Sequence, residues 1–184
     1  MRRYIISFFV TLGLIALLII LLLSGGNKPK TPGGQTLPSY ASTDAQVSVL
    51  IDGPINADSL HNQILITVDN TNVTYEHLTG YDGTSVDTRV YSNTEAAYDA
   101  FLHALYHAGF TEGNNDPKLR DESGYCPTED RYIFELTQDN NTLERYWNTT
   151  CNHTKTYEGD TGLTLRLFKA QVPDYNALTQ NIAL

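Results

Sequence analysis

The sequence predicts an α+β domain outside a membrane, joined by a flexible linker to an N-terminal transmembrane helix. Three observations predict this organisation. Residues 4–23 form an unbroken apolar run, residues 24–46 are rich in Gly, Pro, Ser and Thr, and residues 47–184 carry short β-branched runs interspersed with helical patterns. A small antiparallel sheet with helices on one face belongs to the α+β class. The last segment has about the usual size of one domain, so we expect one.

The apolar run over residues 4–23 contains no charged residue and follows Arg2 and Arg3. At about 1.5 Å per residue, such a helix spans roughly the 30 Å hydrocarbon core of a bilayer. The apolar part of a cleaved signal peptide is usually only about 7 to 15 residues long. We therefore interpret the run as an uncleaved signal anchor, with cleavage near the small residues 24–26 as the alternative. Arginines in the tip, residues 1–3, favour a cytoplasmic N-terminus and an extracytoplasmic C-terminal domain in a single-pass protein of the cell membrane.

The composition changes after the apolar run. Residues 24–46 show no apolar periodicity, and such a segment cannot bury enough apolar surface to offset its conformational entropy. From residue 31 onward, eight basic residues stand against all 21 acidic ones, which leaves 13 negative charges. Binding of nucleic acid requires clustered Lys and Arg, so we expect no nucleic-acid partner. The acidity also predicts that the domain stands off an anionic membrane surface on its linker.

Four short runs in the first half of the domain have the pattern of β-strands. They are rich in β-branched residues and are separated by turn signals such as Asp82-Gly83. The runs cover residues 47–51, 64–68, 73–78 and 86–91. We expect them to form a small antiparallel meander.

The clearest helical pattern follows the meander. Ser92 and Glu95 have the spacing of a capping box, and Gly109 is a typical helix stop. The residues expected to pack on the sheet are Ala97, Phe101, Ala104, Leu105 and Ala108. A second helical pattern begins near Gly162 and is broken by Pro173, and a last short helix is expected over residues 174–181.

Cys126 and Cys151 are the two cysteines of the chain, and both lie in the part expected outside the membrane. Oxidising compartments permit disulfides, so we expect an intramolecular bond between them. Closing a loop of this length contributes about 3.5 kcal/mol in the chain-entropy model. Free thiols and a bond to another chain remain the alternatives.

The segment between the cysteines has the pattern of a β-hairpin. Two alternating runs flank a polar turn, expected at Asn140-Asn141. Pairing across that turn sets Phe134 opposite Trp147 and Tyr132 opposite Thr149. The disulfide would then staple the open end of the hairpin.

A repeat of acidic and histidine residues on the main helix is the best candidate for a metal site. Glu95, Asp99, His103 and His107 recur every four residues, and Asp99, His103 and His107 together could bind a metal ion. Ala104 stands where a zinc protease of the HExxH type has its catalytic glutamate. We favour a solvated helix face with an Asp99–His103 pair, and we assign no metal, no cofactor and no catalytic residue.

Three segments, YDAFLHALYHAGFT, GYCPTEDRYIFEL and RYWNTTC, resemble a group of small, single-pass, membrane-anchored bacterial envelope proteins. In that group a GYCP-type entry and a W-x-x-x-C exit bracket a hairpin. The similarity covers about residues 80–175. It implies an envelope location and a disulfide, and it supplies no activity.

Two classes of function follow. The favoured one is a non-enzymatic envelope module that binds a protein or a glycan, or supports a surface assembly, through an acidic, tyrosine-bearing domain. The rival is a metal-dependent enzyme or metal sensor that uses Asp99, His103 and His107. The oligomeric state does not follow from the sequence.

Overall fold

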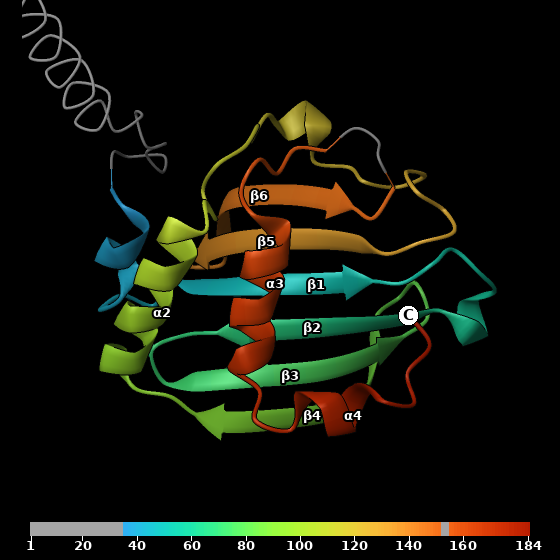
Figure 1. Cartoon of the computed structure of the whole chain (residues 1–184), viewed down its shortest axis with the longest axis horizontal. Helices are drawn as coiled ribbons and strands as arrows, with labels where there is room; N and C mark the ends of the chain where they lie inside the picture. Colours follow the sequence, from blue (N-terminus) through green and yellow to red (C-terminus); the bar gives the residue numbers. More distant parts are fainter. Residues whose placement is uncertain (1–34, 152–154) are drawn as a thin grey trace, which may run out of the picture.

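The computed structural model describes residues 35–151 and 155–184. They form a six-stranded antiparallel sheet in the order β4-β3-β2-β1-β5-β6 (Figure 1). The strands are β1 (Gln46–Asp52), β2 (Asn62–Val68), β3 (Asn72–Thr79), β4 (Thr84–Ser92), β5 (Arg131–Gln138) and β6 (Asn141–Thr149). The helices are α2 (Glu95–His107), α3 (Thr161–Ala170) and α4 (Tyr175–Thr179), with short 3₁₀ turns η1 (Leu37–Tyr40), η2 (Asp58–Leu60) and η3 (Pro117–Leu119).

The expected fold class, an α+β domain with a small sheet and a separate stapled hairpin, is wrong. The hairpin β5–β6 continues the meander as part of one large sheet, because β1 pairs with β2 on one side and with β5 on the other. Val49, for example, lies between Ile66 and Phe134. The alternating patterns predicted the strands themselves. Pairing between strands about 80 residues apart leaves no local signal, so the sequence did not show that β1 is a central strand.

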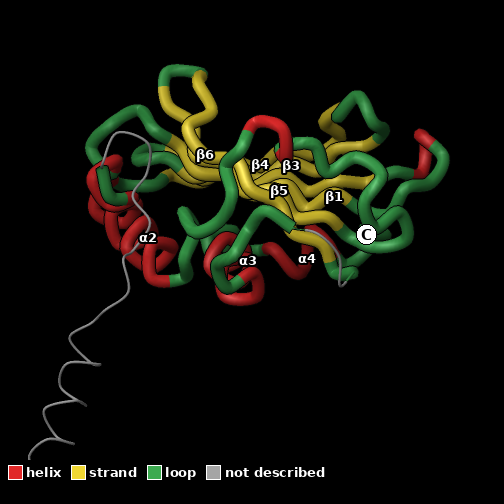
Figure 2. The backbone as a smooth tube through the Cα atoms, turned by 90° about the horizontal axis from the view of Figure 1, so that it is seen from above, coloured by secondary structure: helices red, strands yellow, loops and turns green. Residues whose placement is uncertain are grey.

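The two faces of the sheet differ in what packs against them. Val47, Val49 and Ile51 of β1 point to the side that we call the helix face, where α2, α3 and α4 lie together (Figure 2). Phe101 of α2 and Phe168 of α3 meet there with ring centroids 5.2 Å apart. The alternate residues of each strand point to the opposite side, which we call the open face.

The folded part begins before residue 47, where the domain boundary was expected. Leu37 and Tyr40 of η1 are buried, and η1 packs against α2. The buried Tyr98 hydroxyl of α2 donates to the Ala45 carbonyl at 2.9 Å. The end of the predicted linker, from Leu37, is therefore part of the core, since its few apolar residues find a place beside α2.

Helix α2 begins two residues later than a capping box at Ser92 would place it. Its N-cap is Thr94, whose hydroxyl accepts a hydrogen bond from the Ala97 N–H at 3.2 Å. Its end is as expected, with Gly109 at φ 79°, a left-handed conformation that favours glycine. The buried face consists of Tyr98, Phe101, Leu102, Leu105 and Ala108, so Tyr98 and Leu102 are buried where Ala97 and Ala104 were expected.

The hairpin register differs by one residue from the expected one. The turn is Asp139-Asn140, with φ of 51° and 61°, and a bulge lies before it, between Leu136 and Thr137. Phe134 consequently lies opposite Tyr146, not Trp147. A one-residue shift moves side chains to the other face, so Trp147 lies on the open face.

Among the residues that the structure describes, no helix is long and apolar enough to cross a membrane. The predicted transmembrane segment, residues 4–23, lies outside the described residues.

Candidate ligand-binding site

The open face is covered at β6 by a segment that we call the cover segment, residues 113–125. It lies against β6 at Trp147, whose indole Nε1 donates to the Leu119 carbonyl at 2.7 Å. The Tyr125 ring lies over the same indole, with centroids 4.9 Å apart. Trp147 is thus buried beneath a loop instead of a helix.

Arg145 of β6 fixes the cover segment to the sheet. Its Nε donates to Glu135 Oε1 on the neighbouring strand at 2.9 Å, and its Nη2 lies 2.8 Å from Glu122 Oε2 of the cover segment. Its Nη1 also donates to the Arg120 carbonyl. One guanidinium therefore joins β5, β6 and the loop above them, a geometry for which its planar donors are suited.

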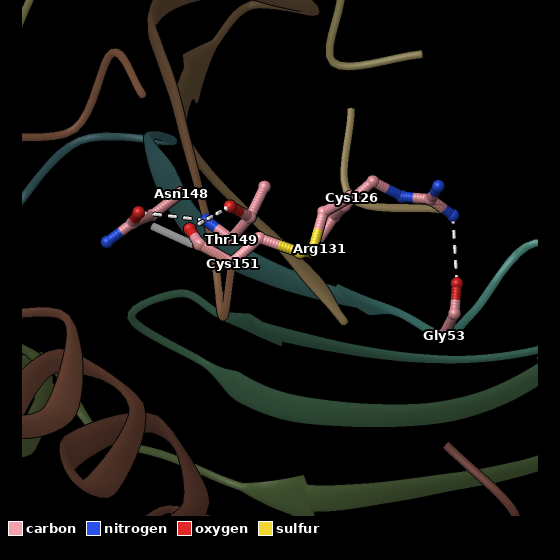
Figure 3. The surroundings of a disulfide bond; sticks show 6 residues. All are labelled: Gly53, Cys126, Arg131, Asn148, Thr149 and Cys151. Atoms are coloured by element: carbon pink, nitrogen blue, oxygen red, sulfur yellow. Dashed lines mark hydrogen bonds between the residues drawn. A yellow bond between two sulfur atoms is a disulfide. The ribbon is translucent and has the colours of Figure 1, made fainter. Parts of the chain in front are cut away.

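The predicted disulfide between Cys126 and Cys151 is confirmed (Figure 3). Its Cα atoms are 5.7 Å apart, and it joins the end of the cover segment to the residues that follow β6. The Thr149 hydroxyl donates to the Cys151 carbonyl at 2.9 Å. The bond thus holds the cover segment at the end nearest the site described next.

A buried ion pair lies where the cover segment ends. Arg131 at the start of β5 is 3% exposed, and its Nε donates to Asp52 Oδ2 at the end of β1 at 2.7 Å. The Arg131 Nη2 donates to the Gly53 carbonyl at 2.8 Å (Figure 3). Gln63 Nε2 donates to the other oxygen of Asp52 at 2.9 Å. Both charges are therefore held in fixed positions on the open face.

His61 lies behind this pair and is fully buried. Its Nδ1 is 3.1 Å from the Pro54 carbonyl, which can only accept, so Nδ1 carries a proton. Its Nε2 lies 2.9 Å from Asp52 Oδ1, at ion-pair distance but without the direction of a hydrogen bond. The imidazole ring stacks on Tyr81, with centroids 4.1 Å apart and 15° between the planes.

Tyr81 follows β3 and forms the exposed wall of the site. Its hydroxyl donates to the Asn56 carbonyl at 2.9 Å and accepts from the Asn56 N–H at 3.0 Å. The side chain is nevertheless 50% exposed. One ring face is covered by His61 and the hydroxyl is occupied, so the free surface of Tyr81 is the other face of its ring.

These groups enclose a cavity of about 250 Å³. Its lining residues are Asp52, Ile55, Tyr81, Glu122, Ser123, Gly124 and Arg131. Apolar walls and a floor of fixed polar groups are the usual composition of a ligand site.

Several exposed apolar side chains belong to the segments that line the cavity. Of the seven large apolar side chains that the described residues expose most, Ile55 and Tyr81 line it. Leu60 follows in the β1–β2 connection, and Leu119 and Tyr125 belong to the cover segment. Exposed apolar side chains that line a cavity, as Ile55 and Tyr81 do, are typical of an interaction surface.

The predicted metal candidates lie on a different part of the molecule. Asp99 Oδ1 and His103 Nε2 are 3.8 Å apart and both side chains are about half exposed. Glu95 and Asp99 line a shallow hollow beside η1 that includes neither His103 nor His107. Within the described ranges, three potential ligands converge only at Cys126, Glu129 and Cys151, where both sulfurs are in the disulfide.

A second buried titratable group lies in the core. Glu144 of β6 is 2% exposed and accepts from the Tyr146 hydroxyl at 2.5 Å. Burial raises the pKa of Glu144, although the hydrogen bond from Tyr146 and the charge of Arg120 act in the opposite direction. Glu144 lines none of the cavities described here, so we assign it to the core.

The sequence did not predict the site at Tyr81. Only some of its residues stand in a recognisable sequence pattern. Asp52 and Arg131 are charged residues at the ends of apolar strands, which is a weak indication of a buried pair. Their contact depends on the β1–β5 pairing, and that pairing was not predictable from local patterns. No protein-family model matches the chain, and no curated protein matches it.

Proposed function

We propose that the domain is a non-enzymatic binding module for a protein or glycan, held outside the membrane by an N-terminal anchor. The observation that carries the proposal is the Tyr81 ring, which is rigidly supported and half exposed beside a polar cavity floor. Tyrosine is common at binding surfaces because it offers a large contact area at little cost in side-chain entropy.

The fixed orientation of Tyr81 defines what it can bind. Its hydroxyl already donates to the Asn56 carbonyl and accepts from the Asn56 N–H. The side chain therefore offers a ligand the flat face of its ring and no further hydrogen bond. A flat aromatic surface packs against the C–H groups of a sugar ring or against an apolar side chain. Ile55 adds an apolar neighbour in the same cavity.

The floor of the cavity supports recognition. Asp52 and Arg131 neutralise each other and are fixed by Gln63 and Gly53, so neither is a free acid or base. Groups held in this way can orient a ligand's hydroxyl or amide groups without further ordering. Glu122 supplies a carboxylate at the rim and is itself held by Arg145.

The proposed location rests on the apolar run at residues 4–23 and on Arg2 and Arg3 before it. The disulfide in the domain supports the same location, since oxidising compartments preserve such bonds. A linker after the anchor would let the domain reach partners in the cell envelope.

The test compares three forms of the full chain on a glycan array and in pull-downs from envelope extracts. Tyr81→Ala should lose binding, whereas Tyr81→Phe should keep most of it because the ring remains. Thermal melts should show that both variants are folded. Retention of parental binding by Tyr81→Ala would contradict the proposal.

A further inference from the structure

The two edges of the sheet differ in how they are covered. The outer edge of β6 is occupied by a later part of the chain, because the Trp147 carbonyl accepts from the N–H groups of Thr156 and Tyr157 at 3.0 Å each. The Thr156 hydroxyl accepts in turn from the Trp147 N–H at 2.8 Å. This edge is therefore closed to any further strand.

The outer edge of β4 is open. No described residue pairs with it on the side away from β3, and it forms the lower edge of the sheet in Figure 1. Seven of its nine residues are exposed, and Val86 and Val90 are exposed by 55% and 61%. Natural sheets usually protect such edges with charged side chains, especially Lys, with Pro, with bulges or with a covering loop. β4 contains neither Lys nor Pro, and its two charged residues, Asp87 and Arg89, have opposite signs.

We propose that β4 pairs with β4 of a second copy of this chain, antiparallel about a two-fold axis through Thr88, so that two sheets become one. This inference is independent of the ligand proposed at Tyr81.

The charges on β4 select this register. A two-fold axis perpendicular to the sheet keeps each face continuous and passes through a pair of identical residues. With Thr88 on the axis, Asp87 lies opposite Arg89 of the other copy, and Arg89 opposite its Asp87. An axis at Asp87 or at Arg89 would instead place like charges directly opposite each other, which is destabilising.

The two charges already lie on one face in the single chain. Arg89 Nη2 is 3.2 Å from Asp87 Oδ1, and both side chains are partly exposed. In the proposed pair, two such ion pairs meet and form a group of four alternating charges. Pairing therefore adds favourable contacts without leaving a charge unpaired.

The apolar residues of β4 fit the same register. Thr88 lies opposite its own copy, and Val90 lies opposite Val86 at both ends of the paired stretch. Pairs of β-branched residues are favourable across strands. The bulge in the β3–β4 ladder is at Val86 itself, since His77 pairs with Asp87 and Leu78 with Ser85, and the regular stretch of the proposed pairing ends there. The register thus covers the two valines that β4 exposes.

A cysteine at the axis provides a direct test. The native cysteines are bonded to each other, so Thr88→Cys introduces a single free thiol. Directly paired residues have Cα atoms about 4.5 to 5.5 Å apart, which suits a disulfide. Full-length Thr88→Cys in detergent should therefore form a covalent dimer on mild oxidation, seen on a non-reducing gel.

Ser85→Cys is the matched control, because Ser85 is also exposed on β4. In the proposed register Ser85 lies opposite Tyr91, so two Ser85 residues are about 20 Å apart. This variant should form no covalent dimer under the same oxidation, although it still pairs non-covalently. Equal cross-linking of both variants, or none with Thr88→Cys, would overturn the proposal.

Charge exchange tests the register without a covalent bond. Asp87→Arg and Arg89→Asp each place like charges opposite each other, and each should raise the dimer dissociation constant about tenfold or more. The double variant restores opposite charges and should dimerise like the parent, and a mixture of the two single variants should form heterodimers. A double variant as weak as the single ones would overturn the register.

Discussion

Arg131 and Asp52 are directly opposite each other in the β1–β5 ladder, and the Arg131 Nε donates to Asp52 Oδ2 at 2.7 Å. Both residues are at least nine-tenths buried, although 79 positions separate them in the chain. The pair ties the β-meander to the hairpin and forms the floor of the cavity beside Tyr81. The same contact thus serves the fold and the candidate site.

Arg131→Met should lower the free energy of unfolding by about 3 to 5 kcal/mol, since it removes one partner of a buried ion pair. Urea denaturation monitored by Trp147 fluorescence measures the change. The matched control is Arg166→Met, because Arg166 is exposed on α3 and its loss should cost no more than about 0.5 kcal/mol. Equal costs for the two variants would contradict this assignment of stability to the pair.

Replacing both Cys126 and Cys151 by Ser should cost about 2 to 5 kcal/mol, because the open chain regains conformational entropy when it unfolds. The cover segment should lose order first, since the bond holds its end to the residues after β6. Hydrogen exchange over residues 113–125 would show this loss. Mass spectrometry of the parent should find no alkylatable thiol before reduction, and two free thiols would refute the bond.

The sequence predicted the strands and helices well where the pattern is local. Alternation in residues 64–68 and the glycine at Gly109 depend only on near neighbours, and both were predicted correctly. The hairpin register required knowing that Asp139 and Asn140 form the turn, which a run of four polar residues does not specify. The site was missed because Tyr81 and Asp52 meet only after the whole sheet has assembled.

Glu144→Gln should change how stability depends on pH. Burial raises the pKa of Glu144 in the folded state above its ordinary value of 4.5. As pH rises through 4.5, the unfolded chain loses this proton first, so the parent loses stability until the pH exceeds the folded-state pKa. The variant lacks this loss and should therefore gain stability relative to the parent as the pH rises above about 4.5.

Denaturation midpoints of the parent and Glu144→Gln at a series of pH values test this prediction. Asp130, whose pKa burial also raises, contributes the same trend to both proteins and cancels in the difference. A constant difference across the series would show that Glu144 does not titrate differently in the folded state.

The proposed topology predicts that protease added to intact cells degrades the domain. Arg2 and Arg3 before the apolar run should keep the N-terminus inside and leave the domain outside. A tag at the N-terminus should remain protected in the same experiment. The orientation is wrong if the domain is cut only after the cells are lysed.

The last prediction concerns the histidines of α2. Replacing His103 and His107 together by Gln should leave the domain folded and cost well under about 1 kcal/mol, because exposed substitutions usually change stability little. His107 is exposed, and His103 contacts Asp99 at 3.8 Å in a pair open to solvent.

A structural metal would behave differently, since its binding energy is part of the folding energy. Thermal melts of parent and variant with and without EDTA distinguish the two. If EDTA lowers the melting temperature of the parent but not of the variant, a metal is bound at His103 and His107. If EDTA changes neither melting temperature, both side chains belong to the solvated surface.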